Sequence, residues 1–300
     1  MTESAVEVDI GGRRLKLSNL DKVLWPKTGF TKGQMIDYYA RIAPVMLGHV
    51  AGRPITLKRY PNGVDKQFFY EKNCPSHRPP WLPTIDMGGI GYCCLGEAAA
   101  LVWTANLAAI EIHPSLARSE NLERPTAIVF DLDPGEGADV LTCGRVAFLL
   151  REALDQLGLH SWVKTSGSKG LQLYLPLNTA VTYGDTRTFS RALAQVLERQ
   201  HPDLIVTTQD KSVRPTKVLI DWSQNTASKT TVSVYSLRAR DRPTASTPVE
   251  WDEVAAAMKA EDPERLVFEA PDVLARIDEK GDLMAPLLSV EQSLPGASSA

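Results

Sequence analysis

Two aspartates separated by one residue follow an apolar stretch near the middle of the chain, in the segment IVFDLDPGEG at 128–137. The apolar residues predict a strand, and Pro134 with Gly135 predicts a turn directly after it. Side chains alternate along a strand, so Asp131 and Asp133 point to the same side, about 7 Å apart along the chain. At about 5 Å and an effective dielectric constant of 20, two carboxylates repel by about 3 kcal/mol. A hard divalent cation such as Mg²⁺ or Mn²⁺ would remove that cost.

A third carboxylate, Asp221, ends another apolar strand in the segment VLIDWSQN. If the two strands are neighbours, Asp221 reaches the same rim as Asp131 and Asp133. Three acidic strand ends without a nearby lysine or arginine predict a site for two ions, about 3.5–4 Å apart, that clamps a phosphoryl transfer. The alternative is that these are solvated strand-end carboxylates or turn caps, because Asp-Pro-Gly is an ordinary turn sequence. A D-x-D pair alone also occurs in phosphatases and sugar transferases.

Several segments offer groups that bind phosphate. The loop Ser166–Gly170, between two expected strands, is predicted to be rich in free backbone N–H groups, and Lys169 adds a point charge. Arg238 and Arg240 stand two apart on an expected strand, so their guanidinium groups share a face suited to a triphosphate or a nucleic-acid backbone. His113 directly precedes a proline. A plain hairpin turn, a solvent-facing strand and a structural histidine are the respective alternatives.

The N-terminal part combines basic and aromatic side chains. Such a combination suits the backbone and stacked bases of a single strand. Either aromatic residue could instead belong to the core of its strand. The residues are Asn19, Lys22, Lys27 and Lys32 ahead of the first helix, Lys58 and Arg59 on the following strand, and Phe69 and Tyr70 soon after.

The elements that must position these residues follow from hydrophobic spacing. A capping box from Thr31 to Gln34 begins a helix within 27–47. Strands are expected over 54–60 and 66–72, an irregular stretch over 73–96, and a buried helix over 96–112 that leads to His113. Further strands are expected over 126–133, 161–165, 171–177, 204–208, 217–222 and 231–238, and helices over 142–157, 186–200 with Asp185 as N-cap, 248–260 and 270–281.

This order of elements predicts an α/β (α+β) fold with mixed central sheets flanked by helices. We expect one domain over 1–290, with a basic DNA-contacting part (1–125), a catalytic core (126–240) and C-terminal helices (241–290). Residues 291–300 are expected to form a flexible tail.

The net charge of −3 conceals an asymmetry, because residues 1–72 carry 12 Lys and Arg against 7 Asp and Glu, whereas residues 241–300 carry 5 against 13. A nucleic-acid partner would therefore need a local basic track. The chain shows no signal peptide and no membrane-spanning stretch, so we expect a cytoplasmic protein. Without a C-x-x-C motif, the cysteines are predicted to be reduced thiols; they are Cys74, Cys93, Cys94 and Cys143.

Taken together, these motifs resemble the archaeo-eukaryotic primase superfamily, specifically the polymerase domain of bacterial ligase D and its stand-alone primase-polymerase relatives. The resemblance covers 17–282. Its markers are LSNLDKVLWPKTGFTK, KRYPNGVD, FFYEK, VFDLDPGEG, TSGSKGL, VLIDWSQN and YSLRAR.

The resemblance implies a role for most of the candidate residues. Asp131, Asp133 and Asp221 would be the catalytic carboxylates that hold two Mn²⁺ or Mg²⁺ ions. The implied nucleotide-binding residues are His113, Ser166, Gly167, Lys169, Gln224, Arg238, Phe69 and Tyr70. The implied DNA-binding residues are Asn19, Lys22 and Lys32 as a 5′-phosphate pocket, together with Lys58 and Arg214; Arg240 is left without a role.

One position departs from the family pattern. Gln172 stands where the family commonly has a histidine, and glutamine donates hydrogen bonds but carries no positive charge. Triphosphate affinity or metal preference would then differ.

We therefore predict that the protein is a bacterial, nucleoid-associated DNA repair polymerase. It would add nucleotides, preferably ribonucleotides, to DNA 3′-hydroxyls at gaps or breaks that carry a 5′-phosphate. NTP or dNTP would be its substrate, and a DNA ligase and end-binding proteins would be its partners. A weakly active or non-catalytic end-binding module and a D-x-D phosphatase or glycosyltransferase remain alternatives. A stand-alone enzyme and a domain of a longer ligase both fit.

Overall fold

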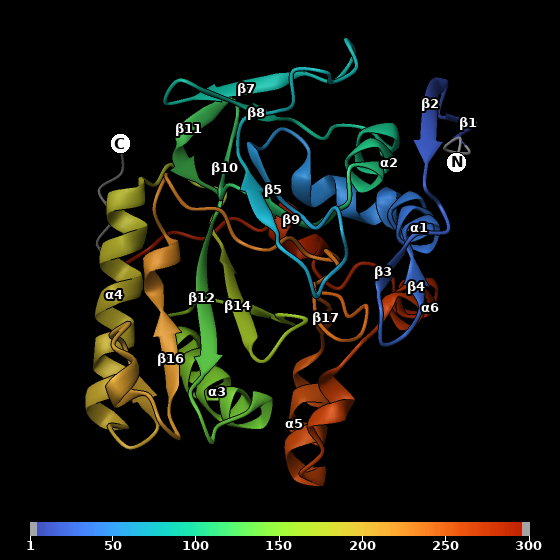
Figure 1. The fold of residues 1–300 in the computed structure, drawn as a ribbon. Coiled ribbons are helices and arrows are strands. Elements are labelled where there is room, and N and C mark those ends of the chain that lie inside the picture. Colours follow the sequence, from blue (N-terminus) through green and yellow to red (C-terminus); the bar gives the residue numbers. More distant parts are fainter. Residues whose placement is uncertain (1–4, 296–300) are drawn as a thin grey trace. The chain divides into compact units, whose positions relative to one another are not determined.

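The computed structural model describes residues 5–295, which divide into two compact units (Figure 1). The first unit contains the chain up to Ser115 together with Val232–Ser246 and Glu269–Gly281. The second contains Leu116–Thr231, Thr247–Phe268 and the chain from Asp282 onward. The expected mixed α/β class is confirmed. Within the described range, no helix combines the length and apolar character needed to cross a membrane.

The first unit holds a five-stranded sheet and three helices. The sheet has the order β6-β5-β8-β7, with β9 also pairing with β5. Helix α1 packs against α2 and α6. The elements are β1 (Ala5–Ile10), β2 (Arg13–Ser18), β3 (Val23–Trp25), β4 (Phe30–Thr31), α1 (Lys32–Val50), β5 (Ile55–Arg59), β6 (Phe69–Glu71), β7 (Thr84–Met87), β8 (Ile90–Cys93), α2 (Ala98–Asn106), β9 (Ala109–Pro114) and α6 (Ala270–Lys280).

The capping box predicted at the start of α1 is confirmed. Thr31 accepts a hydrogen bond from the backbone N–H of Gln34, and the Gln34 side chain accepts one from the N–H of Thr31. These bonds satisfy two of the donors that a helix start leaves unpaired. The helix then buries Met35, Tyr39 and Ile42 along one side.

Three expectations for the first unit are wrong. Residues 73–96 are not irregular throughout, because β7 and β8 form a hairpin whose turn glycines, Gly88 and Gly89, both have positive φ. The expected helix over 96–112 ends at Asn106, and β9 follows it, so His113 lies on a strand. Residues 231–238 form no regular strand; Tyr235 has φ +65°, which interrupts extended backbone.

The cysteine prediction is wrong for two of the four residues. Cys74 and Cys93 are joined by a disulfide that links the segment after β6 to β8. Cys94 and Cys143 are free thiols, as expected. Cys93 is therefore oxidised in a disulfide while the adjacent Cys94 is a free thiol, a difference that the cysteine spacing did not indicate.

The second unit is built on a six-stranded sheet of order β15-β16-β12-β14-β13-β17, whose neighbouring strands are antiparallel except for the parallel pair β15 and β16. Helix α3 packs on β12 and β14, and α4 contacts β12 and β15. The elements are β10 (Ala117–Arg118), β11 (Asn121–Pro125), β12 (Ala127–Pro134), α3 (Val140–Gln156), β13 (Trp162–Thr165), β14 (Leu171–Pro176), α4 (Tyr183–Gln200), β15 (Ile205–Val206), β16 (Val218–Asp221), β17 (Pro248–Val249) and α5 (Trp251–Ala260).

The core of this unit fixes which way β12 faces. Ile128, Phe130 and Leu132 are fully buried in one apolar cluster with α3 residues such as Val146 and Leu150. Because side chains alternate along a strand, the two aspartates of β12 face the opposite side of the sheet.

The predicted helices and strands of this unit are confirmed with shifted ends. One detail is wrong: α4 begins one turn earlier than expected, with Thr182 as its N-cap and Asp185 at the third helical position. The side chains of Thr182 and Asp185 each accept a hydrogen bond from the other residue's backbone N–H. Both residue types are common N-caps, so the sequence alone did not distinguish them.

The predicted tail over 291–300 falls partly outside the described residues, which end at 295. Within them, the Gln292 amide hydrogen-bonds to backbone atoms of His160 and Pro176. The division at residues 125, 240 and 290 stays a prediction.

Candidate active site

Asp131, Asp133 and Asp221 lie on one face of the second unit's sheet. Asp131 on β12 stands directly opposite Asp221 on β16 in the antiparallel register. Directly opposite residues in such a pair have Cβ atoms about 4.5–5.5 Å apart and point to the same side. Asp133 follows two residues after Asp131 and shares its face. The sequence-based expectation that Asp221 reaches the same rim agrees with this register.

The row continues across two further strands. Gln172 on β14 stands opposite Asp131, and Lys164 on β13 stands opposite Gln172. The Gln172 amide donates a hydrogen bond of 3.0 Å to Asp131 Oδ1 and accepts one of 2.7 Å from Lys164 Nζ. Lys164 is fully buried. Four polar side chains, including Asp221, thus cross the sheet in one line.

The expectation that no lysine or arginine lies near the carboxylates is wrong. Arg214, in the loop before β16, places its guanidinium 2.5 Å from Asp133 Oδ2. Lys164 supplies the second positive charge, which acts on Asp131 through Gln172. Neither positive charge could be assigned to the site from the sequence, because Arg214 is 81 residues from Asp133 and Lys164 lies in an apolar strand.

Asp221 is also bound by its own loop. Its Oδ1 accepts hydrogen bonds from the backbone N–H and hydroxyl of Ser223 at 2.9 and 2.5 Å, and its Oδ2 accepts one of 2.8 Å from the Gln224 amide. This is a turn cap, which the sequence had left open as an alternative role. Capping occupies lone pairs of Asp221, but carboxylate oxygens accept more than one partner each.

The environment of Asp131 changes its ionisation. Burial raises its pKa to about 6; the Gln172 hydrogen bond opposes this shift, and the charges of Asp221 and Asp133 add to it. Across residues 5–295, no group of three or more His, Cys, Asp or Glu side chains is gathered closely enough to hold a metal ion as the structure stands. The donor set is nevertheless the all-oxygen type that Mg²⁺ and Mn²⁺ prefer.

The loop Ser166–Gly170 lies between β13 and β14, as expected. Its backbone N–H groups are less free than predicted, because Ser166 Oγ accepts hydrogen bonds from the N–H groups of Ser168 and Gly170 at 3.2 and 3.1 Å. Gly167 has φ +65°. A Cβ at Gly170 would lie 1.9 Å from the Leu132 carbonyl oxygen, so the loop closes against β12 only with glycine there.

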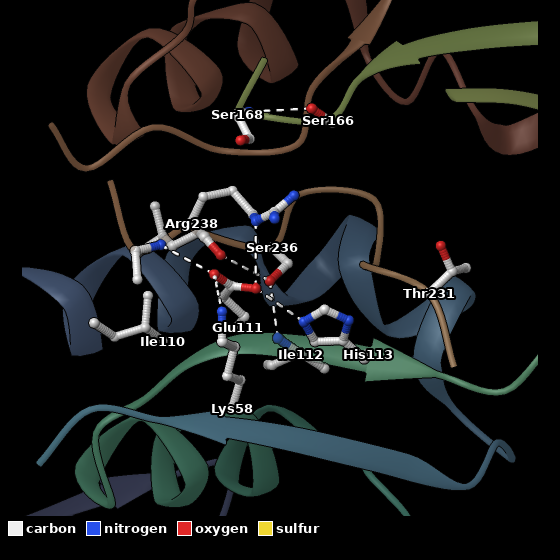
Figure 2. A network of polar contacts seen from close by, with 12 residues as sticks. Lys58, Ile110, Glu111, Ile112, His113, Ser166, Ser168, Thr231, Ser236 and Arg238 are labelled. Carbon is white, nitrogen blue, oxygen red and sulfur yellow. Dashed lines mark hydrogen bonds and ion pairs between the residues drawn. The ribbon is translucent and has the colours of Figure 1, made fainter. Parts of the chain in front are cut away.

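In the first unit, a buried carboxylate that the sequence analysis had not selected contacts a lysine, an arginine and a histidine (Figure 2). Glu111 on β9 contacts Lys58 Nζ at 3.6 Å, His113 Nε2 at 3.0 Å and Arg238 Nε at 3.4 Å. The available signal was the alternation in AIEIHP, which puts Glu111 and His113 on the same face of an apolar strand. Burial lowers the pKa of Lys58, and the charges of Arg238 and Arg240 act in the same direction.

The aromatic pair lies beside this network. Tyr70 and Phe69 on β6 are 58% and 44% exposed, so neither belongs to a core. Tyr70 lies 6.3 Å from the His113 ring and 5.5 Å from Lys58 Nζ, whereas Phe69 lies over Arg59 at 5.1 Å. Phe68, which the sequence reading had not selected, also lies 4.3 Å from Lys58 Nζ.

The predicted 5′-phosphate residues lie near one another in the first unit. Asn19 and Lys22 precede β3, and Lys32 begins α1, where its backbone N–H donates to the Lys22 carbonyl at 2.8 Å. Lys32 Nζ donates to the Ser18 carbonyl at 2.7 Å, and Lys22 donates to Asn62 at 3.1 Å. Asn19 has φ +55° and its carbonyl accepts from the N–H of Lys22. Lys27 is instead ion-paired with Asp241.

Comparison with known proteins places the chain in a family. The model of the LigD primase-polymerase domain matches residues 31–284. The LigD non-homologous end joining protein of Mycolicibacterium smegmatis is 44% identical over 280 residues, which are 91% of this chain and 36% of that protein. The Bacillus subtilis LigD protein is 31% identical over 269 residues, 89% of this chain and 43% of that protein.

A solved structure supports the same family assignment. The polymerase domain of Mycobacterium tuberculosis Ligase D, determined in complex with DNA, has a TM-score of 0.84 and 42% identity, covering 92% of this chain and 98% of that one. Fold and matched sequence define a nucleotidyltransferase of the polymerase and primase type. The chain belongs to the LigD primase-polymerase domain family. It spans about a third of the length of its mycobacterial relatives.

Proposed function

We propose that the protein adds nucleotides, preferably ribonucleotides, to a DNA 3′-hydroxyl at short gaps or breaks. The observation that carries this proposal is the line of Asp221 and Asp131 on adjacent strands with Asp133 on the same face. Membership of the primase-polymerase family supports the reaction class. The names of the relatives support a role in non-homologous end joining.

Asp131, Asp133 and Asp221 would hold two Mn²⁺ or Mg²⁺ ions. When bound, such ions lower the cost of charge on the attacking and leaving oxygens of a phosphoryl transfer. The chain's own part is to hold three carboxylates on one rigid sheet face. Arg214 already contacts Asp133 Oδ2, so a cation would share this carboxylate with the guanidinium or bind through Oδ1.

The nucleotide would be bound by cationic groups and loop donors. The proposed triphosphate ligands are His113, Arg238, Ser166, Gly167 and Lys169, since positive charge and N–H groups suit phosphate oxygens. Gln224, whose amide donates a hydrogen bond to Asp221, is a further proposed nucleotide-binding residue. The exposed rings of Phe69 and Tyr70 would stack on bases.

DNA would be recognised through a downstream 5′-phosphate. Asn19, Lys22 and Lys32 would form the phosphate pocket, with Lys58 and Arg214 as further contacts. The M. tuberculosis neighbour was solved with DNA, which supports a nucleic-acid partner for this chain. A DNA ligase and end-binding repair proteins are proposed partners.

The test is primer extension on gapped, nicked and overhanging templates, with ribo- and deoxynucleotides under Mn²⁺ and Mg²⁺. We expect extension with either metal, more with ribonucleotides, and most at gaps that carry a 5′-phosphate. Failure to extend any template with any metal would overturn the catalytic proposal.

One observation favours a second candidate, an end-binding module with little catalysis. Arg214 neutralises Asp133, and the described residues form no ready metal cluster. That module would bind 5′-phosphorylated ends tightly without extending them. The same assay, run alongside a gel-shift measurement, separates the two.

A further inference from the structure

Glu111 is a carboxylate in an apolar setting. It is 2% exposed, and its neighbours Ile110 and Ile112 on β9 are fully buried. A buried carboxylate destabilises a protein unless it is paired and hydrogen-bonded. A strand that needed only packing would carry an apolar residue there, so the charge requires an explanation.

Both oxygens of Glu111 are used, and their partners come from separate parts of the first unit. Oε2 is 3.0 Å from His113 Nε2 and 3.4 Å from Arg238 Nε. Oε1 is 3.6 Å from Lys58 Nζ and accepts a hydrogen bond of 3.2 Å from the N–H of Ala239. One carboxylate therefore ties together β5, β9 and the segment Val232–Ser246 (Figure 2).

The charge states follow from these contacts. Burial alone would raise the pKa of Glu111, but the His113 hydrogen bond and the charges of Arg238 and Lys58 hold it well below its usual range. Burial lowers the pKa of His113. Because ionised Glu111 can only accept, a neutral His113 must carry its proton on Nε2, and Nδ1 points away from the carboxylate (Figure 2).

We propose that Glu111 is a positioning residue that aims Lys58, His113 and Arg238 at an anionic ligand, the triphosphate of the incoming nucleotide. The proposal rests on the proposed function, which assigns the triphosphate to His113 and Arg238. Glu111 itself does not touch the ligand. It keeps three flexible or rotatable side chains in one arrangement and so reduces the ordering that binding would otherwise require.

A mere counter-charge would behave in the opposite way. Glu111 carries a negative charge beside an anion site, so by Coulomb's law alone its neutralisation should tighten anion binding. Positioning predicts that the same neutralisation weakens binding, because the cations lose their shared acceptor and repel one another. The sign of the change in Kd therefore distinguishes the two roles.

The experiment measures binding of inorganic tripolyphosphate and of ATP by calorimetry, at fixed ionic strength and without divalent cations. We expect Glu111→Gln to weaken both about tenfold or more, and Glu111→Asp, which keeps the charge but shortens the side chain, to weaken both to a lesser degree. The matched control is Glu97→Gln, which breaks the Arg13–Glu97 pair elsewhere in the unit and should change Kd less than twofold. Unchanged or tighter binding by Glu111→Gln overturns the proposal.

Two further readouts keep the outcome clear. Imidazole ¹⁵N shifts of the wild-type protein should show His113 as the Nε2–H tautomer at pH 7.5; the Nδ1–H tautomer would overturn the proposal even if Glu111→Gln does not fold. If the wild type binds no triphosphate, the proposed nucleotide site fails with it. If the wild type binds and extends primers but Glu111→Gln binds equally well, only the positioning role fails.

Discussion

Asp131 and Asp221 stand directly opposite each other on the antiparallel strands β12 and β16. They are 90 positions apart in sequence, and two α-helices and three strands lie between β12 and β16. The register brings two like charges side by side at a place where Asp131 is buried enough for its pKa to rise to about 6. An arrangement this unfavourable in the free protein suits a site whose ligand is a cation.

The first prediction concerns Asp131. Asp131→Asn keeps the size of the side chain but removes a negative charge, so we expect primer extension to fall at least about 100-fold, since loss of even outer-shell partners of a metal costs about 10–100-fold. Binding of gapped DNA, measured by fluorescence anisotropy, should change less than threefold.

The control for that variant is Glu152→Gln, an exposed charge removal on α3 of the same unit. It should leave extension unchanged. An Asp131→Asn protein that extends primers at the wild-type rate would remove Asp131 from the catalytic set.

The second prediction concerns the 5′-phosphate. Lys22 lies in the turn with Asn19 before β3, and its carbonyl accepts a hydrogen bond from the N–H of Lys32 at the start of α1. A charged contact to phosphate contributes about 1.5–3 kcal/mol. We expect Lys22→Ala to reduce the preference for a 5′-phosphorylated gap about tenfold, without changing extension on an open primer-template. The measurement compares gaps with and without the phosphate.

Lys27→Ala is the matched control, because Lys27 lies in the next turn, between β3 and β4, but is already paired with Asp241. The Lys27→Ala variant should keep the wild-type preference for a 5′-phosphorylated gap. If the wild type itself fills both kinds of gap equally well, the pocket hypothesis is lost.

Sequence patterns predicted the second unit well because its signals are local. Apolar runs such as that before Asp131, and caps such as Thr31 with Gln34, specify strands and helix starts within a few residues. The order of elements was enough to propose the mixed sheet. The three candidate carboxylates could be selected because charge at the end of an apolar strand is conspicuous in sequence, and their catalytic role stays a prediction.

Pairings over long distances could not be predicted from such patterns. The ion pair of Arg214 with Asp133 and the bond from Lys164 to Gln172 depend on strand register and loop path. The helix expected over 96–112 was too long because Ala and Leu continue past Asn106, and only the turn at Ala108, with φ +57°, ends it. Local composition favoured a helix there, whereas the sheet that β9 joins favoured a strand.

The third prediction concerns Gln172, where the sequence resemblance led us to expect a histidine. Its amide is both the acceptor for buried Lys164 and a donor to Asp131. Gln172→Leu removes both, and a buried charged donor that loses its acceptor costs at least about 1–3 kcal/mol. We expect the free energy of unfolding in urea to fall by about that amount and extension to drop.

Gln172→His, which restores the common residue, should retain most of the stability because imidazole can both donate and accept. Gln156→Leu, at the exposed C-terminal end of α3, controls for the change in polarity. Full stability in Gln172→Leu would show that Lys164 finds another partner and that the line of polar side chains contributes little.

The last prediction uses the pH dependence of stability through His113. Burial lowers the pKa of His113 below its ordinary value of about 6.5, so the unfolded chain takes up the proton first as pH falls. The free energy of unfolding should therefore decrease between pH 7.5 and 5.5. Glu111 adds no slope in this window, because its pKa is lowered and it is ionised in both states above about pH 5.5.

We expect His113→Gln to lose less stability than the wild type over the same interval, because the substitution removes the group whose pKa folding lowers. Urea unfolding at the two pH values gives this double difference, which cancels the contributions of other titrating groups. His77→Gln, at a histidine outside the Glu111 network, is the matched control substitution. A His113→Gln slope equal to or steeper than that of the wild type would mean that His113 is not held neutral, and that the charges of Glu111, Lys58 and Arg238 balance differently around it.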